Sequence, residues 1–153
     1  GTHDPTGWAS GQPLGILRSS HTTVIVDDID RAAEFYQTVL SGVPFHETHS
    51  PRAVFIAVGI NSVIELRVPE SDSPEAHSLA DDGAMIWSTT FLVRHVDAAA
   101  EHLAEIGVGA TTTGDVLTID RDQAFGARYA FTAEVTPGDP RGSQTGRASY
   151  RAV

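Results

Sequence analysis

Apolar and polar positions along the chain form two similar patterns that lie about 67 residues apart. Residues 23–34 read TVIVDDIDRAAE, and residues 90–101 read TFLVRHVDAAAE. Each segment starts with an alternating, β-branched run typical of a strand, and continues into a helical pattern that we expect an Asp to cap. Because strand, cap and helix recur at one offset, the sequence indicates an internal duplication.

Short β-prone runs follow each predicted helix, and Gly, Pro, Asp and Asn separate them. In chain order these runs cover 43–48, 53–58, 62–68, 108–113, 116–120 and 127–135. Each half is therefore predicted to be a βαβββ module. The first helix is predicted to turn one apolar stripe toward its sheet, formed by Ala32, Ala33, Phe35, Tyr36, Val39 and Leu40.

The modules define the expected architecture, which is α+β. Two of them side by side, with their helices outside, would form a cup-shaped curved sheet whose hollow suits a small ligand. We expect one domain over 19–136, made of modules 19–69 and 84–136 and a polar linker 70–83, with an extended N-terminal arm 1–18 and a C-terminal tail 137–153.

Composition narrows the chemistry that the domain can carry. The chain has 153 residues, no cysteine and a formal charge of −10, and all ten of its basic residues are arginine. The absence of cysteine and lysine excludes disulfides, thiolate metal sites, thiol nucleophiles and Schiff-base lysines. The negative charge disfavours nucleic acid and anionic lipid as partners. No apolar run approaches the roughly 20 residues of a membrane span, so we expect a cytoplasmic domain that acts on a small molecule or on another protein.

The chain resembles the vicinal oxygen chelate superfamily, which includes glyoxalases, bleomycin resistance proteins and dioxygenases. The resemblance covers about residues 19–135, and is most similar to the methylmalonyl-CoA epimerase subgroup in the linker and near residues 126–131. It implies paired βαβββ modules, a small-molecule ligand and a homodimer. The segments that carry it are His21–Asp30, Ala32–Tyr36, Val39–Gly42, Val63–Leu66 and Thr90–Glu101.

The resemblance also implies a divalent metal held by four side chains. The first two positions fall on His21 and Glu65, and strand alternation turns Glu65 away from its neighbours Ile64 and Leu66. The third falls on Ser88, a poor metal ligand, and the fourth has no clean match. The ligand set is therefore incomplete, so no cofactor is assigned and a divalent ion stays an open alternative.

Several further residues are candidates for the site. Glu65 and His21 are predicted to be catalytic, together with Glu47, which lies close to where epimerase relatives place a carboxylate. Arg67 shares the inferred face of Glu65, where it would pair with that carboxylate or bind an anionic group. The residues predicted to contact substrate are Trp87, Arg67, Ser88, Tyr129 and His49.

Three functions are compatible with these residues. The first is a proton-transfer enzyme of the isomerase or lyase class, such as an epimerase, isomerase or cyclase acting on a carbonyl-containing metabolite of bacterial specialised metabolism. The second is a non-catalytic antibiotic-binding protein of the bleomycin-resistance type. The third is a metal enzyme whose ligand set is completed by Glu134.

Overall fold

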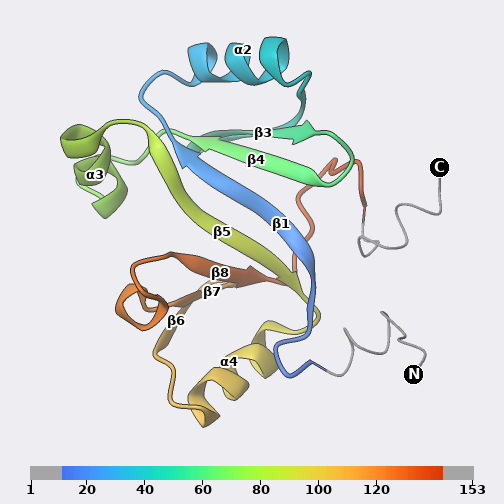
Figure 1. Cartoon of the computed structure of the whole chain (residues 1–153), viewed down its shortest axis with the longest axis vertical. Helices are drawn as coiled ribbons and strands as arrows, with labels where there is room; N and C mark the ends of the chain where they lie inside the picture. Colours follow the sequence, from blue (N-terminus) through green and yellow to red (C-terminus); the bar gives the residue numbers. More distant parts are fainter. Residues whose placement is uncertain (1–11, 143–153) are drawn as a thin grey trace. The chain divides into compact units, whose positions relative to one another are not determined.

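The computed structural model describes residues 12–142, which contain eight strands and three α-helices (Figure 1). Within this range no helix combines the length and the apolar composition that crossing a bilayer requires. The helices are α2 (Ile29–Val39), α3 (Pro74–Asp82) and α4 (Val96–Glu105), and η1 (Arg121–Ala124) is a short 3-10 helix. The strands are β1 (Ile16–Ile25), β2 (Val43–His49), β3 (Arg52–Val58), β4 (Ser62–Arg67), β5 (Met85–Val93), β6 (Ala110–Thr113), β7 (Val116–Ile119) and β8 (Tyr129–Thr132).

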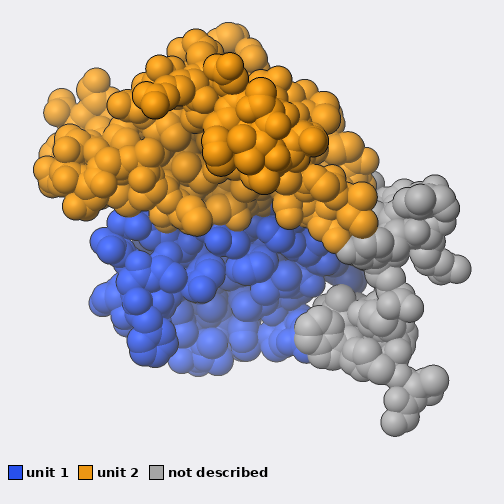
Figure 2. Space-filling view, turned by 45° about the horizontal axis from the view of Figure 1, so that its top comes forward, with its two compact units in different colours: residues 1–20, 89–135 blue, residues 21–88, 136–153 orange. Residues whose placement is uncertain are grey.

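The strands belong to one mixed sheet with the hydrogen-bonded order β2-β3-β4-β1-β5-β8-β7-β6. The chain divides into two compact units, which Figure 2 colours separately. Unit 1 contains residues 1–20 and 89–135, and unit 2 contains residues 21–88 and 136–153. Strands β1 and β5 contribute residues to both units.

The two units repeat the same topology, as the sequence repeat predicts. In unit 2, β2–β3 and β3–β4 pair antiparallel, while β4 pairs parallel with β1. In unit 1, β6–β7 and β7–β8 pair antiparallel, while β8 pairs parallel with β5. The predicted α+β fold with paired βαβββ modules is confirmed. The curvature that would make the sheet a cup stays a prediction.

The core of unit 2 lies between α2 and one face of its strands. Ile29 and Val26 pack there against Val54, Ile56 and Leu66, and Ala32, Ala33 and Tyr36 complete the contact from α2. The predicted stripe on α2 is wider than the face that is buried, since Phe35 and Val39 stay more than half exposed. With about 100° between successive helical residues, these two side chains point away from the sheet. The corresponding core of unit 1 contains Val93, Ala99, Leu103, Leu117 and Phe131.

The two repeated helices begin differently. The Asp28 carboxylate accepts a hydrogen bond from the backbone N–H of Arg31, 3.1 Å away, which caps α2 as predicted. Helix α4 starts after His95, whose side chain makes no capping hydrogen bond. The prediction of an Asp cap in the second copy is therefore wrong, because the only Asp there, Asp97, lies inside the first turn.

The element boundaries refine the predicted organisation. Strand β1 begins at Ile16, three residues inside the predicted arm. The predicted linker contains all of α3, whose first turn is capped by the Ser73 hydroxyl and carries a Pro at its start. Of the predicted tail, residues 137–142 are described. Within them, Asp139 and Arg141 are buried in unit 2.

A buried ion pair fastens this segment of the tail. The Arg141 guanidinium donates to both oxygens of Asp139, with Nε–Oδ1 and Nη2–Oδ2 distances of 3.1 and 2.8 Å. Its Nη1 atom donates to the backbone carbonyl of Asn61, 2.9 Å away, in the turn between β3 and β4. Both side chains are satisfied by this bidentate geometry, which is the condition under which a buried ion pair is tolerated.

Removing one partner of this pair is expected to be costly. Arg141→Met should lower the free energy of unfolding by about 3–5 kcal/mol, because the buried Asp139 carboxylate would lose the guanidinium that pairs with both of its oxygens. Urea unfolding followed by circular dichroism measures the loss. The double variant Asp139→Asn/Arg141→Met should lose clearly less than the single variant. A single variant within about 0.5 kcal/mol of wild type would contradict the structural role.

Candidate functional site

Strand register places one row of side chains across the four strands of unit 2. His46 on β2 lies opposite Phe55 on β3, Phe55 lies opposite Glu65 on β4, and Glu65 lies beside Thr23 on β1. Directly paired residues share a face of a sheet. The other face carries Val54 and Leu66, which pack under α2. The row of His46, Phe55, Glu65 and Thr23 therefore lies on the face that α2 does not cover.

Glu65 is the centre of a polar cluster on this face. Its side chain is 9% exposed, and its Oε1 atom accepts a hydrogen bond from the Thr23 hydroxyl at 2.6 Å. The Nη2 atom of Arg67 donates to the same oxygen at 3.1 Å, and the His21 Nε2 atom lies 3.6 Å from it. The second oxygen, Oε2, forms no hydrogen bond within residues 12–142. One oxygen is thus held while the other stays available.

Arg67 links the two carboxylates of the cluster. Its Nη2 atom is shared between Glu65 and the Thr23 hydroxyl, which lies 3.4 Å away, and its Nη1 atom is 3.8 Å from Glu75 Oε2 on α3. Its Nε atom is buried and has no hydrogen-bond partner among the described residues. Buried donors are normally paired, so this N–H lacks the acceptor that such a donor usually has. We call His21, Thr23, Glu65, Arg67 and Glu75 the Glu65 cluster.

His21 is the basic member of this cluster. Its ring meets Phe55 edge-on, with 5.3 Å between ring centroids, and its side chain is 14% exposed. Burial is the main cause that lowers the pKa of His21 below the ordinary 6.5. The negative charge of Glu65 raises this pKa, whereas the positive charges of Arg67 and Arg141 lower it further. A neutral imidazole is therefore the form present near about pH 7.

An apolar pocket of about 480 Å³ lies beside the cluster. It is lined by Val43, Phe45 and Ala57 of β2 and β3, and by Gly138 and Pro140 of the docked tail, among others. Ala57 is two residues from Phe55 on the same strand, so both face the same way. The Phe45 and Phe55 rings are 6.3 Å apart, which connects the pocket lining to the cluster.

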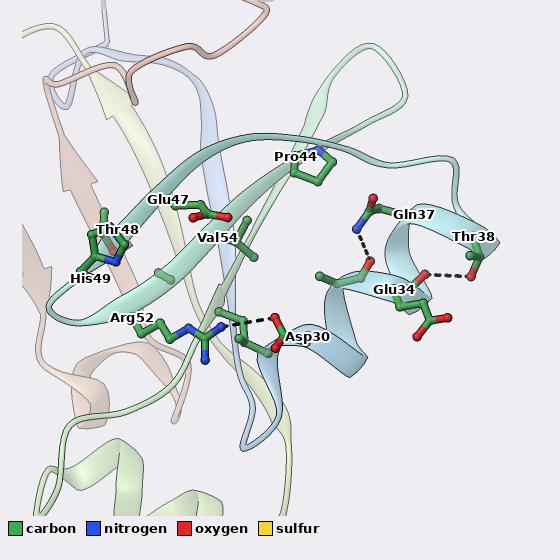
Figure 3. A pocket seen from close by; sticks show the side chains of 13 residues that line it. Asp30, Glu34, Gln37, Thr38, Pro44, Glu47, Thr48, His49, Arg52 and Val54 are labelled. Carbon is green, nitrogen blue, oxygen red and sulfur yellow. Dashed lines mark hydrogen bonds and ion pairs between the residues drawn. The ribbon is translucent and has the colours of Figure 1, made fainter.

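The structure does not bring Glu47 to Glu65. A β-bulge between Pro44 and His46 shifts the register of β2, so that Glu47 pairs with Val54 and His49 with Arg52. Both therefore point to the α2 side and line a separate pocket of about 540 Å³, where Arg52 also pairs with Asp30 at 3.3 Å (Figure 3). The expectation that Glu47 acts beside Glu65 is corrected, because one extra residue reverses which face a side chain occupies.

The remaining candidates lie elsewhere on the strands. Trp87 and Ser88 are partly buried neighbours on β5, and successive strand residues point to opposite faces, so the two cannot both share the face of the cluster. Tyr129 belongs to unit 1, where its ring lies 6.1 Å from that of Phe91. Glu134 is also in unit 1, is exposed and lines a small polar pocket with His95 and Asp97.

Sequence reasoning missed three structural features of unit 2. Thr23 lies two residues after His21 on the same strand face, so alternation could have found it. Glu75 comes from α3, and the buried pair of Asp139 and Arg141 comes from the tail. These are brought close by tertiary packing, for which the local pattern carries no signal.

The side chains of the cluster do not fit a divalent metal. His21 and Glu65 supply two ligand atoms, and residues 12–142 contain no group of three or more His, Cys, Asp or Glu side chains that could hold an ion. The Arg67 guanidinium already lies 3.1 Å from Glu65 Oε1. A fixed positive charge at this distance repels a metal cation and offsets the carboxylate charge that would attract one.

Comparison with known proteins identifies the family. Residues 18–144 match the model of the Glyoxalase/Bleomycin resistance protein/Dioxygenase superfamily. The chain belongs to this superfamily. No curated protein matches it in sequence.

Solved structures of several other proteins have a similar fold. Methylmalonyl-CoA epimerase from Mycobacterium tuberculosis is 25% identical, with a TM-score of 0.70 over 80% of this chain and 90% of its own. A Streptomyces coelicolor methylmalonyl-CoA epimerase variant in complex with 2-nitronate-propionyl-CoA is 19% identical, with a TM-score of 0.70 over 82% and 99% of the two chains. A hypothetical protein from Bacillus halodurans is 21% identical, with a TM-score of 0.69 over 80% and 97%. At 19% and 21% identity, the likeness concerns the fold alone.

The lowered pKa of His21 predicts a pH-dependent stability. Because the unfolded chain binds a proton at His21 near pH 6.5 and the folded chain only at lower pH, stability is complete above about pH 6.5 and falls as the pH drops below it. His21→Asn should therefore lose less stability than wild type between about pH 7.5 and 5.5 in urea unfolding. His77→Asn, at an exposed histidine of α3, should keep the wild-type dependence. Equal pH dependence in wild type and His21→Asn would contradict the assignment.

The misfit of the cluster to a metal predicts the outcome of metal titration. Protein purified without chelator should carry less than about 0.1 equivalent of zinc, iron, cobalt or manganese by elemental analysis. Arg67→Ala should raise the affinity for added Co²⁺ in calorimetric titration, because it removes the competing positive charge while keeping His21 and Glu65. One full equivalent of metal in the wild-type protein would refute this account of Arg67.

Proposed function

We propose that the protein is a small-molecule enzyme that moves a proton at a carbon next to a carbonyl group, as an isomerase, epimerase or cyclase does. The observation that supports this most is the Glu65 cluster itself. A carboxylate with one free oxygen, a neutral imidazole and a guanidinium with an unpaired N–H meet on one buried face of unit 2. General acid–base chemistry needs these groups within reach of one another.

Each group has a defined role in the proposed reaction. Glu65 Oε2 removes the proton from the carbon next to the carbonyl, and the electron pair of the C–H bond moves into the carbonyl to form an enolate. Arg67 donates its Nε–H to the enolate oxygen and stabilises the negative charge that develops there. Thr23 holds Glu65 Oε1 and so fixes the direction of Oε2. His21, neutral because it is buried, exchanges the proton with Glu65.

The charge of the chain bears on the substrate. Several structural neighbours are described as complexes with acyl-CoA compounds, and the phosphates of coenzyme A are strongly negative. This chain carries a formal charge of −10, and its cluster contains two carboxylates against one guanidinium. Such a surface repels polyanions. We therefore propose an uncharged carbonyl compound with an apolar substituent, for which the adjoining pocket of about 480 Å³ supplies room.

A non-catalytic binding protein is the second candidate. It is favoured by the internal engagement of Glu65 Oε1, to which both Thr23 and Arg67 donate hydrogen bonds. In that case the cluster would orient a polar ligand without moving its protons, and the ligand would be recovered unchanged.

Solvent exchange distinguishes the two candidates without knowledge of the natural substrate. The probes are the (R) and (S) 2-phenylpropionyl thioesters of N-acetylcysteamine, which are uncharged, with methylmalonyl-CoA as the anionic comparison. In D₂O the wild-type protein should speed deuterium uptake into the thioesters, as measured by mass spectrometry. Glu65→Gln should reduce this rate about 10²–10⁴-fold, while the exposed Glu70→Gln should not.

Two results would contradict the proposed function. The first is binding of the thioesters, seen as a rise in melting temperature, with no deuterium uptake above the uncatalysed rate; this favours the binding protein. The second is undiminished uptake in Glu65→Gln with intact folding by circular dichroism, which would remove Glu65 from the reaction.

A further inference from the structure

We propose that His46 is a second acid–base group, which protonates the reacting carbon on the side opposite to Glu65. The inference deepens the proposed function and rests on it. It makes the reaction an inversion of configuration, because a proton leaves on one face of the carbon and another arrives on the opposite face.

The β-bulge in β2 places His46 on the face of the cluster. With regular pairing after Pro44 and Ile56, the next pair would be Phe45 with Phe55, and His46 would lie opposite Val54 under α2. The bulge instead pairs His46 with Phe55. Bulges are frequent beside active sites, where they redirect a side chain. Here the redirected side chain is an imidazole.

Phe55 lies between the two proposed acid–base groups. The ring of His46 is 5.6 Å from that of Phe55, while His21 contacts the same ring at 5.3 Å. His46 comes from the strand on one side of β3, and Glu65 comes from the strand on the other side. Neighbouring strands are about 4.8 Å apart, so His46 and Glu65 are separated by about twice this spacing. A small substrate carbon above the Phe55 ring would have one group on each side.

The environment of His46 suits proton delivery. Its side chain is partly buried, and it forms no hydrogen bond or ion pair within residues 12–142, so both ring nitrogens are available to a ligand or to water. Protonated His46 gives its proton to the enolate carbon and becomes neutral, while Glu65 holds the proton that it removed. The enolate electron pair forms the new C–H bond, and both groups return to their starting states by exchange with water.

The test compares the two mirror-image probes in His46→Asn. With the (R) and (S) thioesters in D₂O, the isomer whose proton Glu65 removes should still exchange within about threefold of the wild-type rate. The isomer whose proton His46 removes in the reverse direction should lose exchange by about 10²-fold or more, and interconversion of the isomers should fall equally. Chiral chromatography with mass spectrometry measures all three rates. His77→Asn, at an exposed histidine of the same unit, is the matched control.

Each outcome decides the proposal. Loss of exchange for one isomer only, with interconversion lost, supports His46 as the second group. Equal reduction for both isomers indicates that His46 only packs against Phe55, and unchanged rates remove it from the reaction; either result overturns the inference and leaves the proposed function standing. Failure of the wild-type protein to exchange either isomer overturns both the inference about His46 and the proposed function.

Discussion

The pairing of Glu65 with Arg67 is the constraint on which the rest of the site depends. A carboxylate that is 9% exposed pays a large desolvation cost unless an opposite charge and hydrogen-bond donors accompany it. Arg67 supplies the charge and Thr23 supplies the shortest hydrogen bond. Both act on Oε1, so the carboxylate is fixed in one orientation. The same contacts that make its burial tolerable also fix the orientation of its second oxygen.

This arrangement bears on how one fold supports different chemistries. The His21 imidazole lies 3.6 Å from Glu65 Oε1, and the Arg67 guanidinium lies 3.1 Å from the same oxygen. A guanidinium and a metal ion can both stabilise an oxyanion, one through N–H donors and the other through coordination. The arginine acts through its own N–H groups and needs no set of metal ligands. Function therefore has to be argued from these side chains, since the fold alone does not decide it.

The sequence predicted the fold more completely than the site. Periodicity and the repeat gave both βαβββ modules, because strand alternation and helical spacing are local and the duplication reinforced them. Alternation also predicted that the Glu65 side chain would point to the other face of the sheet from Ile64 and Leu66. The packing of Ile64 and Leu66 in the core under α2 confirms this. The helical pattern of apolar residues did not predict that Phe35 is exposed, because such a pattern does not show how much of the helix surface the sheet covers. Glu75 on α3 and Arg141 in the tail are brought to the other parts of unit 2 by packing that the local sequence does not encode.

The β2 strand shows why site prediction failed at one residue in particular. Glu47 has the right residue type, and regular pairing of β2 with β3 would turn it toward Glu65. One extra residue in the strand reverses this: the Phe45 ring contacts Phe55 from the bulge, His46 joins the row of the cluster, and Glu47 faces α2. Because side chains alternate with a period of two, a single bulge exchanges the chemistry of the two faces without altering the fold. In a sheet that carries its functional side chains on one face, the register of the strand matters as much as the identity of the residue.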